Sequence, residues 1–129
     1  GPQELGKKIP ASYDRFAEHD SRDWLPRTHA NVNDATATLI LVSHRQYDRD
    51  GVLVGGSGRT LAYASGWKPA RAKDIGEAGQ PFPSDVEEVQ DWLRRIKEPG
   101  CVLNVAGPRA SKWPGGYEAA RAFLRAVLK

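Results

Sequence analysis

The sequence predicts an α/β fold with three layers, in which a parallel sheet carries helices on both faces. Two apolar runs, Thr38–Val42 and Cys101–Val105, are short and rich in branched side chains, as in strands buried on both faces. Helical patterns alternate with these runs along the chain, which is typical of parallel strands joined by right-handed crossovers. The length of 129 residues predicts a single domain over residues 1–129.

The first half of the chain reads as helix, strand, helix and strand. Pro26 suits the first turn of a short helix that precedes Thr38–Val42. The charged segment His44–Gly51 is expected to be an exposed loop. Glycines then open a short helix that ends at Gly66. Ala70–Ile75 is polar at every second position and is interpreted as a half-exposed strand.

The second half reads as helix, strand and helix. Ser84–Glu87 has the spacing of a capping box, with Glu three residues after Ser. The helix that it opens places Val86, Val89, Leu93 and Ile96 on one face and stops before Pro99-Gly100. The last helix begins near Tyr117 and places Ala120, Leu124 and Val127 on the same face as that tyrosine.

Composition narrows the classes of function. The net charge of +3 is spread along the chain without a Lys/Arg block, so nucleic acid is not indicated as a partner. Cys101 is the single cysteine, which excludes an internal disulfide and suits a small buried apolar residue. No apolar run approaches the roughly 18 residues of a membrane span, and no signal peptide is visible, so no membrane contact and a cytoplasmic location are expected.

His19, His29 and His44 lie in unrelated contexts without ligand spacing, so no metal site is predicted. There are no internal repeats. Gly1-Pro2 is interpreted as the scar of a tag-cleaving protease and is left out of the fold argument.

Two segments have compositions that suit the binding of an anion. After Cys101–Val105 the strand is broken at Gly107-Pro108, and the loop that follows carries Arg109, Ser111 and Lys112. Ligands of open α/β sheets bind at the carboxyl ends of the strands, where this loop would lie. Gly55–Thr60 offers a glycine-rich helix start, whose unpaired N–H groups favour anions. A solvated strand-to-helix turn and an ordinary tight turn remain the alternatives for the two segments.

Several motifs resemble one bacterial family. Leu103–Lys112, with Pro114-Gly115 and Tyr117-Glu118 after it, resembles the C-terminal signature of the family named "putative molybdenum carrier", within the Rossmann-like SLOG superfamily. That superfamily also holds the lysine-decarboxylase-like cytokinin-activating proteins and the DNA-processing DprA proteins. The segment Arg27–Leu41 resembles the family's helix-then-strand segment, and Gly55–Pro69 its Gly-Gly-Thr phosphate loop. The likeness covers roughly residues 7–129.

The chain departs from the family at three places, one of which is Ala70–Ile75, a segment more polar than the family's usual apolar strand. Family members open with a strand and a Gly-Gly-Gln-Thr-Gly-type loop, which nothing here matches, so the Rossmann-like sheet is expected to be shortened at its N-terminus. A natural short form, a trimmed chain, or one half of a split or paired assembly would each explain this. Ser57-Gly58-Arg59 also stands where a simpler Gly-Gly-Thr run is usual. Without its usual neighbour, Thr38–Val42 is expected to be an edge strand covered by a second copy or by residues 9–16.

The resemblance implies a nucleotide or nucleotide-derived ligand held by phosphate contacts, with no separate cofactor. The expected ligand-binding residues come from the two anion-friendly segments and, by family likeness, from two asparagines: Gly55, Gly56, Ser57, Gly58, Arg59, Thr60, Asn104, Gly107, Arg109, Ser111, Lys112 and Asn31.

Three functions therefore compete: a binding module for such a ligand, a nucleoside-monophosphate phosphoribohydrolase, and a ligand-free fragment that binds a partner. The superfamily's hydrolases resemble a Pro-Gly-Gly-x-Gly-Thr-x-x-Glu pattern, whose Glu works near the ribose. No acidic residue lies in the matching helix here, which favours the binding module. Asp34 and Asp74 remain as possible catalytic carboxylates, although Asp34 is equally well explained as a residue at a helix end.

Overall fold

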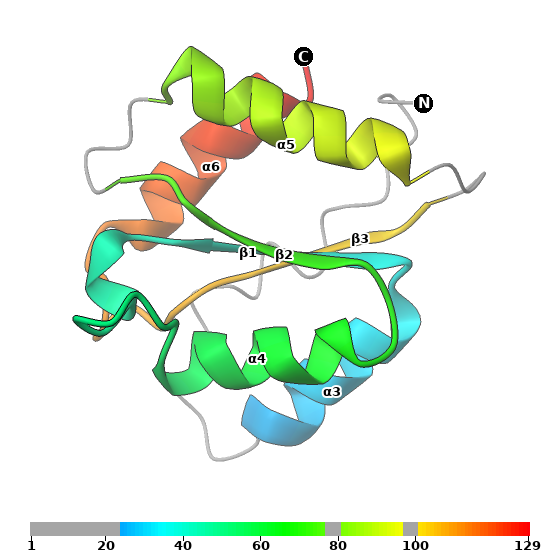
Figure 1. Ribbon diagram of the computed structural model, residues 1–129, viewed down its shortest axis with the longest axis vertical. Coiled ribbons are helices and arrows are strands. Elements are labelled where there is room, and N and C mark those ends of the chain that lie inside the picture. Colours follow the sequence, from blue (N-terminus) through cyan, green and yellow to red (C-terminus); the bar gives the residue numbers. More distant parts are fainter. Residues whose placement is uncertain (1–23, 77–80, 97–100) are drawn as a thin grey trace.

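A computed structural model of the protein describes residues 24–76, 81–96 and 101–129. Helices and strands alternate along the chain, as Figure 1 shows. In order they are α3 (Trp24–Asp34), β1 (Ala37–Val42), the 3-10 helix η2 (His44–Gln46), α4 (Gly55–Ser65), β2 (Ala70–Asp74), α5 (Pro83–Arg95), β3 (Leu103–Ala106) and α6 (Gly116–Val127).

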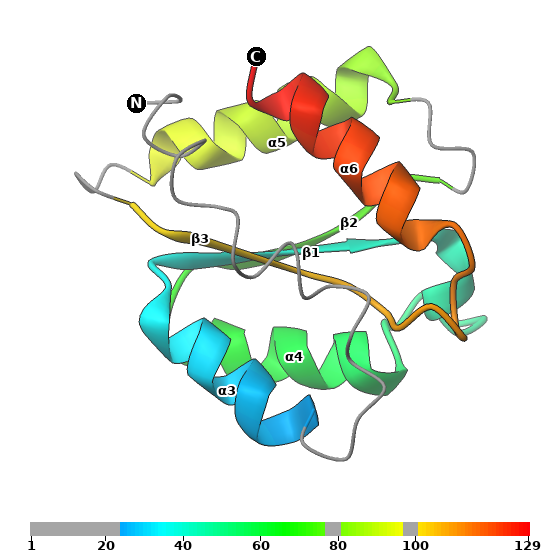
Figure 2. The same ribbon diagram turned by 180° about the vertical axis from the view of Figure 1, so that it is seen from behind.

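The strands form a parallel sheet in the order β2-β1-β3. Thr38 of β1 lies opposite Ala70 of β2 and opposite Asn104 of β3. Helices α3 and α4 cover one face of this sheet, and α5 and α6 cover the other, in both views (Figures 1 and 2). The predicted α/β fold with a parallel sheet between two helical layers is therefore confirmed, as is the parallel pairing of the two apolar runs.

The main core lies between the sheet and the layer of α5 and α6. Successive residues of a strand face opposite sides of the sheet, and the side that carries Leu39 and Leu41 of β1 belongs to this core. Leu103 and Val105 of β3 join them there. The helices contribute Val89, Leu93, Ala119, Ala120, Phe123, Leu124 and Val127 to the same cluster. All six residues of β1 are buried because helices and strands surround this strand on every side.

The expectation that Thr38–Val42 is an edge strand, covered by a second copy or by another segment, is wrong. β1 is the central strand and pairs along its length with β2 and with β3. The expectation rested on the family's first strand, which has no match in the sequence, whereas β2 and β3 occupy the two sides of β1. Residues 9–16, which were expected to cover this edge, lie outside the described residues. A homo-oligomer stays a prediction, but it no longer has an exposed β1 to explain it.

The expected capping box at Ser84 is also wrong. The N-cap of α5 is Phe82, two residues before Ser84, and the helix begins at Pro83 with no side-chain capping bond among the described residues. Proline suits the first helical position because its missing N–H needs no partner there. Ser84 is thus already inside the first turn, and the carboxylate of Asp85 in that turn pairs with Lys73 instead.

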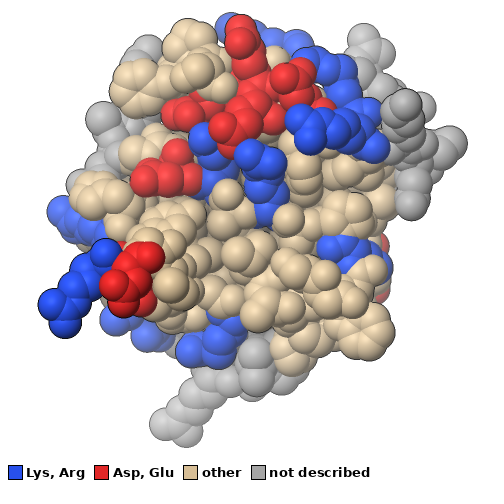
Figure 3. Space-filling model, in the orientation of Figure 1, with Lys and Arg blue, Asp and Glu red and all other residues tan. Residues whose placement is uncertain are grey.

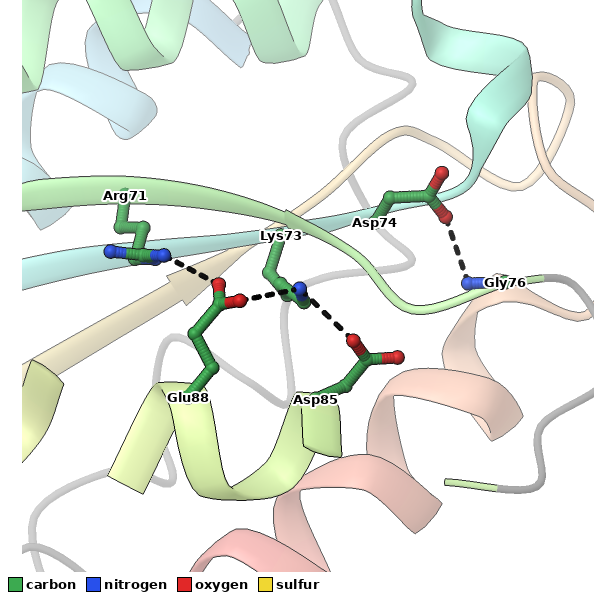
Figure 4. A network of polar contacts seen from close by, with 6 residues as sticks. All are labelled: Arg71, Lys73, Asp74, Gly76, Asp85 and Glu88. Carbon is green, nitrogen blue, oxygen red and sulfur yellow. Dashed lines mark hydrogen bonds and ion pairs between the residues drawn. The ribbon is translucent and has the colours of Figure 1, made fainter. Parts of the chain in front are cut away.

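Ion pairs join β2 to α5 and explain the polar alternation of this strand. Figure 3 shows acidic side chains gathered over α5 with basic side chains beside them. In Figure 4, the guanidinium of Arg71 donates to the carboxylate of Glu88. The Nζ of Lys73 lies 3.0 Å from Oδ1 of Asp85 and 3.1 Å from Oε1 of Glu88. The half-buried strand is confirmed, but its charged side chains meet the acids of α5.

These contacts also change the acidity of the groups. The hydrogen bond from Arg71, together with that from Lys73, holds the pKa of Glu88 below its ordinary value, against a smaller opposing effect of burial. Burial alone would lower the pKa of Lys73, but its hydrogen bonds to Asp85 and Glu88 outweigh burial and raise that pKa. Lys73 and Glu88 are therefore both held in their charged forms at neutral pH.

Candidate functional site

Two predicted segments meet at the carboxyl edge of the sheet, which lies to the left in Figure 1. Because β1 and β3 run parallel, the connections that follow them leave the sheet at the same edge. The connection after β1 leads to the start of α4, which contains Gly55–Thr60. The connection after β3 contains Gly107–Lys112 and leads to α6.

The segment after β1 is held by its own hydrogen bonds. Ser43 caps the 3-10 helix η2 in a capping box with Gln46, whose side chain is only 7 % exposed. Asp48 Oδ1 accepts hydrogen bonds from the N–H groups of Asp50 and Val52, each at 2.9 Å. His44–Gly51 was expected to be an exposed loop, and this is wrong for Gln46, which is buried.

Glycines shape the start of α4. Gly55 has a φ of +71°, a left-handed conformation that side chains with a Cβ rarely adopt, and it turns the extended chain at Val54 into the helix. At Gly58, an added Cβ would lie 2.4 Å from the carbonyl oxygen of Leu53, so the preceding loop packs directly on the helix backbone. These two glycines therefore let the loop and the helix start approach each other.

The N-terminus of α4 has neither a side-chain cap at Val54 nor an acidic side chain in its first turn, Gly55–Ser57, among the described residues. The first N–H groups of a helix have no acceptor within the helix, and the helix dipole places partial positive charge there. This end of α4 therefore has the groups that favour an anion.

Two hydroxyl groups lie buried on α4. Thr60 Oγ1 donates to the carbonyl oxygen of Gly56 at 2.9 Å. Ser57, which is 5 % exposed, has a buried Oγ that finds no hydrogen-bond partner among the described residues. An unsatisfied buried polar group costs about 1–3 kcal/mol, so the Ser57 hydroxyl is a feature that stability alone does not favour.

The segment after β3 is anchored in the core while its polar residues lie outside. Trp113 is 2 % exposed and belongs to the core cluster, and Gly116 packs against its indole ring. The N–H groups of Lys112 and Trp113 both donate to the carbonyl oxygen of Arg109, at 2.9 and 3.2 Å. The side chains of Arg109, Ser111 and Lys112 are exposed, and Gly107 is half-buried.

Gln46 connects the two segments directly. Its side-chain Nε2 donates to the carbonyl oxygen of Lys112 at 3.2 Å. Its main-chain carbonyl oxygen accepts from the N–H of Val54, the N-cap of α4, at 2.9 Å. This residue was not predicted from the sequence. The Ser-x-x-Gln spacing of a capping box was present from Ser43 to Gln46, but its partner 66 residues away could not be inferred.

The two predicted asparagines lie apart from these segments. Asn31 is in the last turn of α3, next to the amino end of β1 and therefore at the opposite edge of the sheet. Asn104 is buried within β3, and its Nδ2 donates to Thr38 Oγ1 of β1 at 3.3 Å. The structure thus brings Gly55–Thr60 and Gly107–Lys112 to one edge, leaves Asn31 at the other, and places Asn104 in the sheet between them.

The acids considered for catalysis are also apart from each other. Asp34 ends α3 at the amino edge, whereas Asp74 ends β2 at the carboxyl edge and accepts a hydrogen bond from Gly76 N–H at 2.9 Å (Figure 4). Burial, together with the charge of Asp74, raises the pKa of the nearby Tyr47 hydroxyl, against a smaller opposing effect of Lys73. At neutral pH Tyr47 is therefore protonated.

Metal-ligating side chains are scattered over the part of the chain that the structure describes. No three of its His, Cys, Asp and Glu side chains are grouped so that they could hold a metal ion. His29 instead stacks on Tyr63 with ring centroids 3.8 Å apart, and Cys101 is buried. His19 lies outside the described residues. Among the described helices, none is both long and apolar enough to cross a membrane.

The fold and this edge define a Rossmann-like α/β domain of the SLOG class. The sequence profile of the "Circularly permutated YpsA SLOG family" matches residues 3–128, and the chain belongs to this family. This finding confirms the resemblance to the SLOG superfamily that the motifs indicated.

A solved structure is also similar to the chain. It is the crystal structure of a "Putative molybdenum carrier protein" from Syntrophus aciditrophicus, with 30 % sequence identity and a TM-score of 0.63. The match covers 85 % of this chain but only 63 % of that protein. No functionally curated protein matches the sequence.

Proposed function

We propose that the carboxyl edge of this sheet binds a phosphorylated nucleotide or a nucleotide-derived ligand. Its phosphate would lie between the start of α4 and the segment Gly107–Lys112. The observation that carries the proposal is the hydrogen bond from Gln46 to Lys112, which holds an uncompensated helix N-terminus beside a basic loop. Neither segment alone would make a strong case, because tight turns and basic loops are common.

The contributions of the two segments are complementary. Backbone N–H groups and the dipole of α4 favour negative charge by about 0.3–1 kcal/mol for an exposed contact. The hydroxyl of Ser57 lies in the same turn, buried and without a hydrogen-bond partner among the described residues. On the other side, Arg109 can bind a phosphate through two parallel hydrogen bonds, and Lys112 adds a point charge. Asn31 is not part of this proposed site, since it lies at the opposite edge.

A second candidate ligand is a bare oxyanion. The name of the similar protein from Syntrophus aciditrophicus refers to molybdenum, and molybdate, like phosphate, is a tetrahedral anion with oxygen acceptors. The same groups would bind either anion. Binding of a nucleotide would exceed that of the free anion only if the base or sugar also makes contacts.

Calorimetric titration with ADP-ribose, AMP, inorganic phosphate and molybdate tests the proposal. We expect saturable binding of a nucleotide, and we expect Arg109→Ala to weaken it by more than tenfold, which is about 1.4 kcal/mol or more. Arg125→Ala is the control, because Arg125 is also exposed on the surface but lies in the last turn of α6. It removes the same charge far from the site and should leave the affinity unchanged.

Each other result of this titration has a meaning. Equal affinities for the wild type and Arg109→Ala would remove Arg109 from the site. Tighter binding of molybdate than of any nucleotide would favour the oxyanion. Absence of binding by all four compounds would contradict the proposal and favour a ligand-free partner-binding domain. Release of free base from AMP would show the phosphoribohydrolase activity that the acid-free α4 argues against.

A further inference from the structure

We infer that Gln46 is a positioning residue, which sets the distance between the start of α4 and the basic segment after β3. The inference rests on the proposed function, because it states how the two parts of that site are held in register. Gln46 itself is buried and is not expected to touch the ligand. Its effect would be transmitted through the backbone of the residues that it binds.

The amide of Gln46 uses both of its ends. Oε1 accepts from Ser43 N–H at 2.8 Å and from Ser43 Oγ at 2.9 Å, while Nε2 donates to the carbonyl oxygen of Lys112 at 3.2 Å. A backbone N–H can only donate and a carbonyl can only accept, so these partners dictate which way the amide points. Neither an apolar side chain nor a carboxylate can satisfy both partners.

Residue 46 links three points of the backbone: its side chain binds Ser43 and Lys112, and its main-chain carbonyl oxygen accepts from Val54 N–H, a bond that every substitution at this position keeps. Ser43 directly follows β1, Val54 is the N-cap of α4, and Lys112 lies in the segment between β3 and α6. All three belong to the carboxyl edge, where the proposed phosphate would touch both segments at once. A ligand held from two sides is sensitive to their spacing, since a misplacement of about 1 Å already weakens such contacts strongly.

Simple capping of η2 explains only part of this arrangement. Any side chain at position 46 with an acceptor oxygen could accept the hydrogen bonds of Ser43, and these bonds stabilise only the 3-10 helix η2. The donor end of the amide instead reaches a carbonyl 66 residues away in sequence. A carboxylate at position 46 would keep the acceptor for Ser43 and lose this second bond, which makes the two roles separable by experiment.

Gln46→Glu and Gln46→Met test the inference, with Gln90→Glu as a matched control. Gln90 of α5 also uses its Nε2 to bind a distant carbonyl, that of Val127 at 3.0 Å, but this bond joins α5 to the end of α6, away from the site. In calorimetric titration with ADP-ribose, we expect both Gln46 variants to bind at least tenfold more weakly than the wild type. Gln90→Glu should bind like the wild type.

The two Gln46 variants separate spacing from charge. Glu adds a negative charge near the proposed anion site, whereas Met is neutral and of similar length. Weak binding by Gln46→Glu with normal binding by Gln46→Met would assign the effect to charge and overturn the inference. Gln46→Glu retains the acceptor for Ser43 and is therefore the variant more certain to fold, which circular dichroism would check.

Amide hydrogen exchange provides a readout that needs no ligand. The N–H groups of Lys112 and Trp113 are bound to the carbonyl of Arg109 within the segment that Gln46 holds. We expect them to exchange at least tenfold faster in Gln46→Met, with no change at the N–H of Leu128, which is bound to Leu124 at the end of α6.

This second readout keeps the two claims apart. If the wild type binds none of the probes, the proposed function fails, and the exchange rates alone decide whether Gln46 orders the segment after β3. Unchanged exchange at Lys112 and Trp113 would overturn the inference whether or not a ligand binds.

Discussion

Helices α4 and α5 both begin at the carboxyl edge of the sheet, but their first turns differ in charge. α5 starts with Pro83, which lacks an N–H, and carries Asp85, whose carboxylate pairs with Lys73 of β2. α4 starts with two glycines and a serine, without an acid and without a side-chain capping bond among the described residues. α6 resembles α5 in this respect, because Glu118 lies in its first turn.

This contrast separates a structural end of a helix from a candidate binding end. At α5, opposite charges satisfy one another within the chain, so little is left for a ligand. At α4, the first backbone N–H groups have no acceptor within the helix, and the Ser57 hydroxyl has no hydrogen-bond partner among the described residues.

Gly58→Ala should destabilise the protein by about 1–3 kcal/mol, as overpacking usually does. The added Cβ would lie 2.4 Å from the carbonyl oxygen of Leu53, so the loop that covers the helix start would have to move. Helix propensity alone predicts the opposite sign, a gain of roughly 1 kcal/mol. Chemical denaturation of both proteins measures the difference.

Gly66→Ala is the control for this substitution. Gly66 follows α4, has an ordinary right-handed conformation, and would place its Cβ 3.6 Å from the nearest atom, the carbonyl oxygen of Tyr63. We expect a neutral effect or a small gain in stability. An equal loss at both positions would show that close packing of the loop on α4 is not what Gly58 provides.

Ser57→Ala should leave the free protein as stable as the wild type or more stable by up to about 1 kcal/mol, because it removes a buried hydroxyl that has no hydrogen-bond partner in the described part of the chain. The same change should weaken binding of ADP-ribose if the hydroxyl serves the ligand. Thr60→Val removes a hydroxyl from the same helix that does have a partner, Gly56, and should cost about 0.5–1.5 kcal/mol. Thermal unfolding would reveal whether the two signs differ.

At α5, Glu88→Gln should cost less than about 1 kcal/mol at neutral pH, since Glu88 is substantially exposed and exposed ion pairs contribute little. The folded-state pKa of Glu88 is lowered, chiefly by the hydrogen bond from Arg71. Its stabilisation is therefore complete above its unfolded-state pKa, near 4.3, and is lost as the pH falls through the lower folded-state value.

Stability measured from pH 7 to pH 2 checks this prediction. The wild type and Glu88→Gln should differ at pH 7 and converge in acid. A difference that stays constant over this range would show that Glu88 stabilises the protein through packing, and not through the ion pairs with Arg71 and Lys73 (Figure 4).

Local patterns in the sequence predicted most of the fold. The apolar runs identified β1 and β3, and the alternation of elements predicted a parallel sheet between helical layers. The position of β1 in the sheet was not predictable in this way, because it depends on the pairing of Ala70–Asp74. The alternate charges of that segment suggested water on one side, whereas Arg71 and Lys73 meet acids of α5.

The candidate site was predictable only in part, for the same reason. Glycines before a helix and a basic loop after a strand are local signals, and parallel strands bring them to one edge. Gln46 joins them through a hydrogen bond to Lys112, which is 66 residues away in the sequence, and no local pattern predicts such a contact. Ser84 shows the converse: the spacing of a capping box is present, but the helix begins at Pro83, so its N-cap is Phe82, two residues before Ser84.

The most direct test of the central claim follows backbone amides by NMR while ADP-ribose is added to the wild-type protein. If the open start of α4 and the basic segment form one site, Gly55–Ser57 and Arg109–Lys112 will shift together along a single saturation curve. The amides of Ser84 and Asp85 in the closed first turn of α5 will stay in place. Saturable shifts at the start of α5 with none at α4, or no saturable shift at any of these amides, would contradict the account.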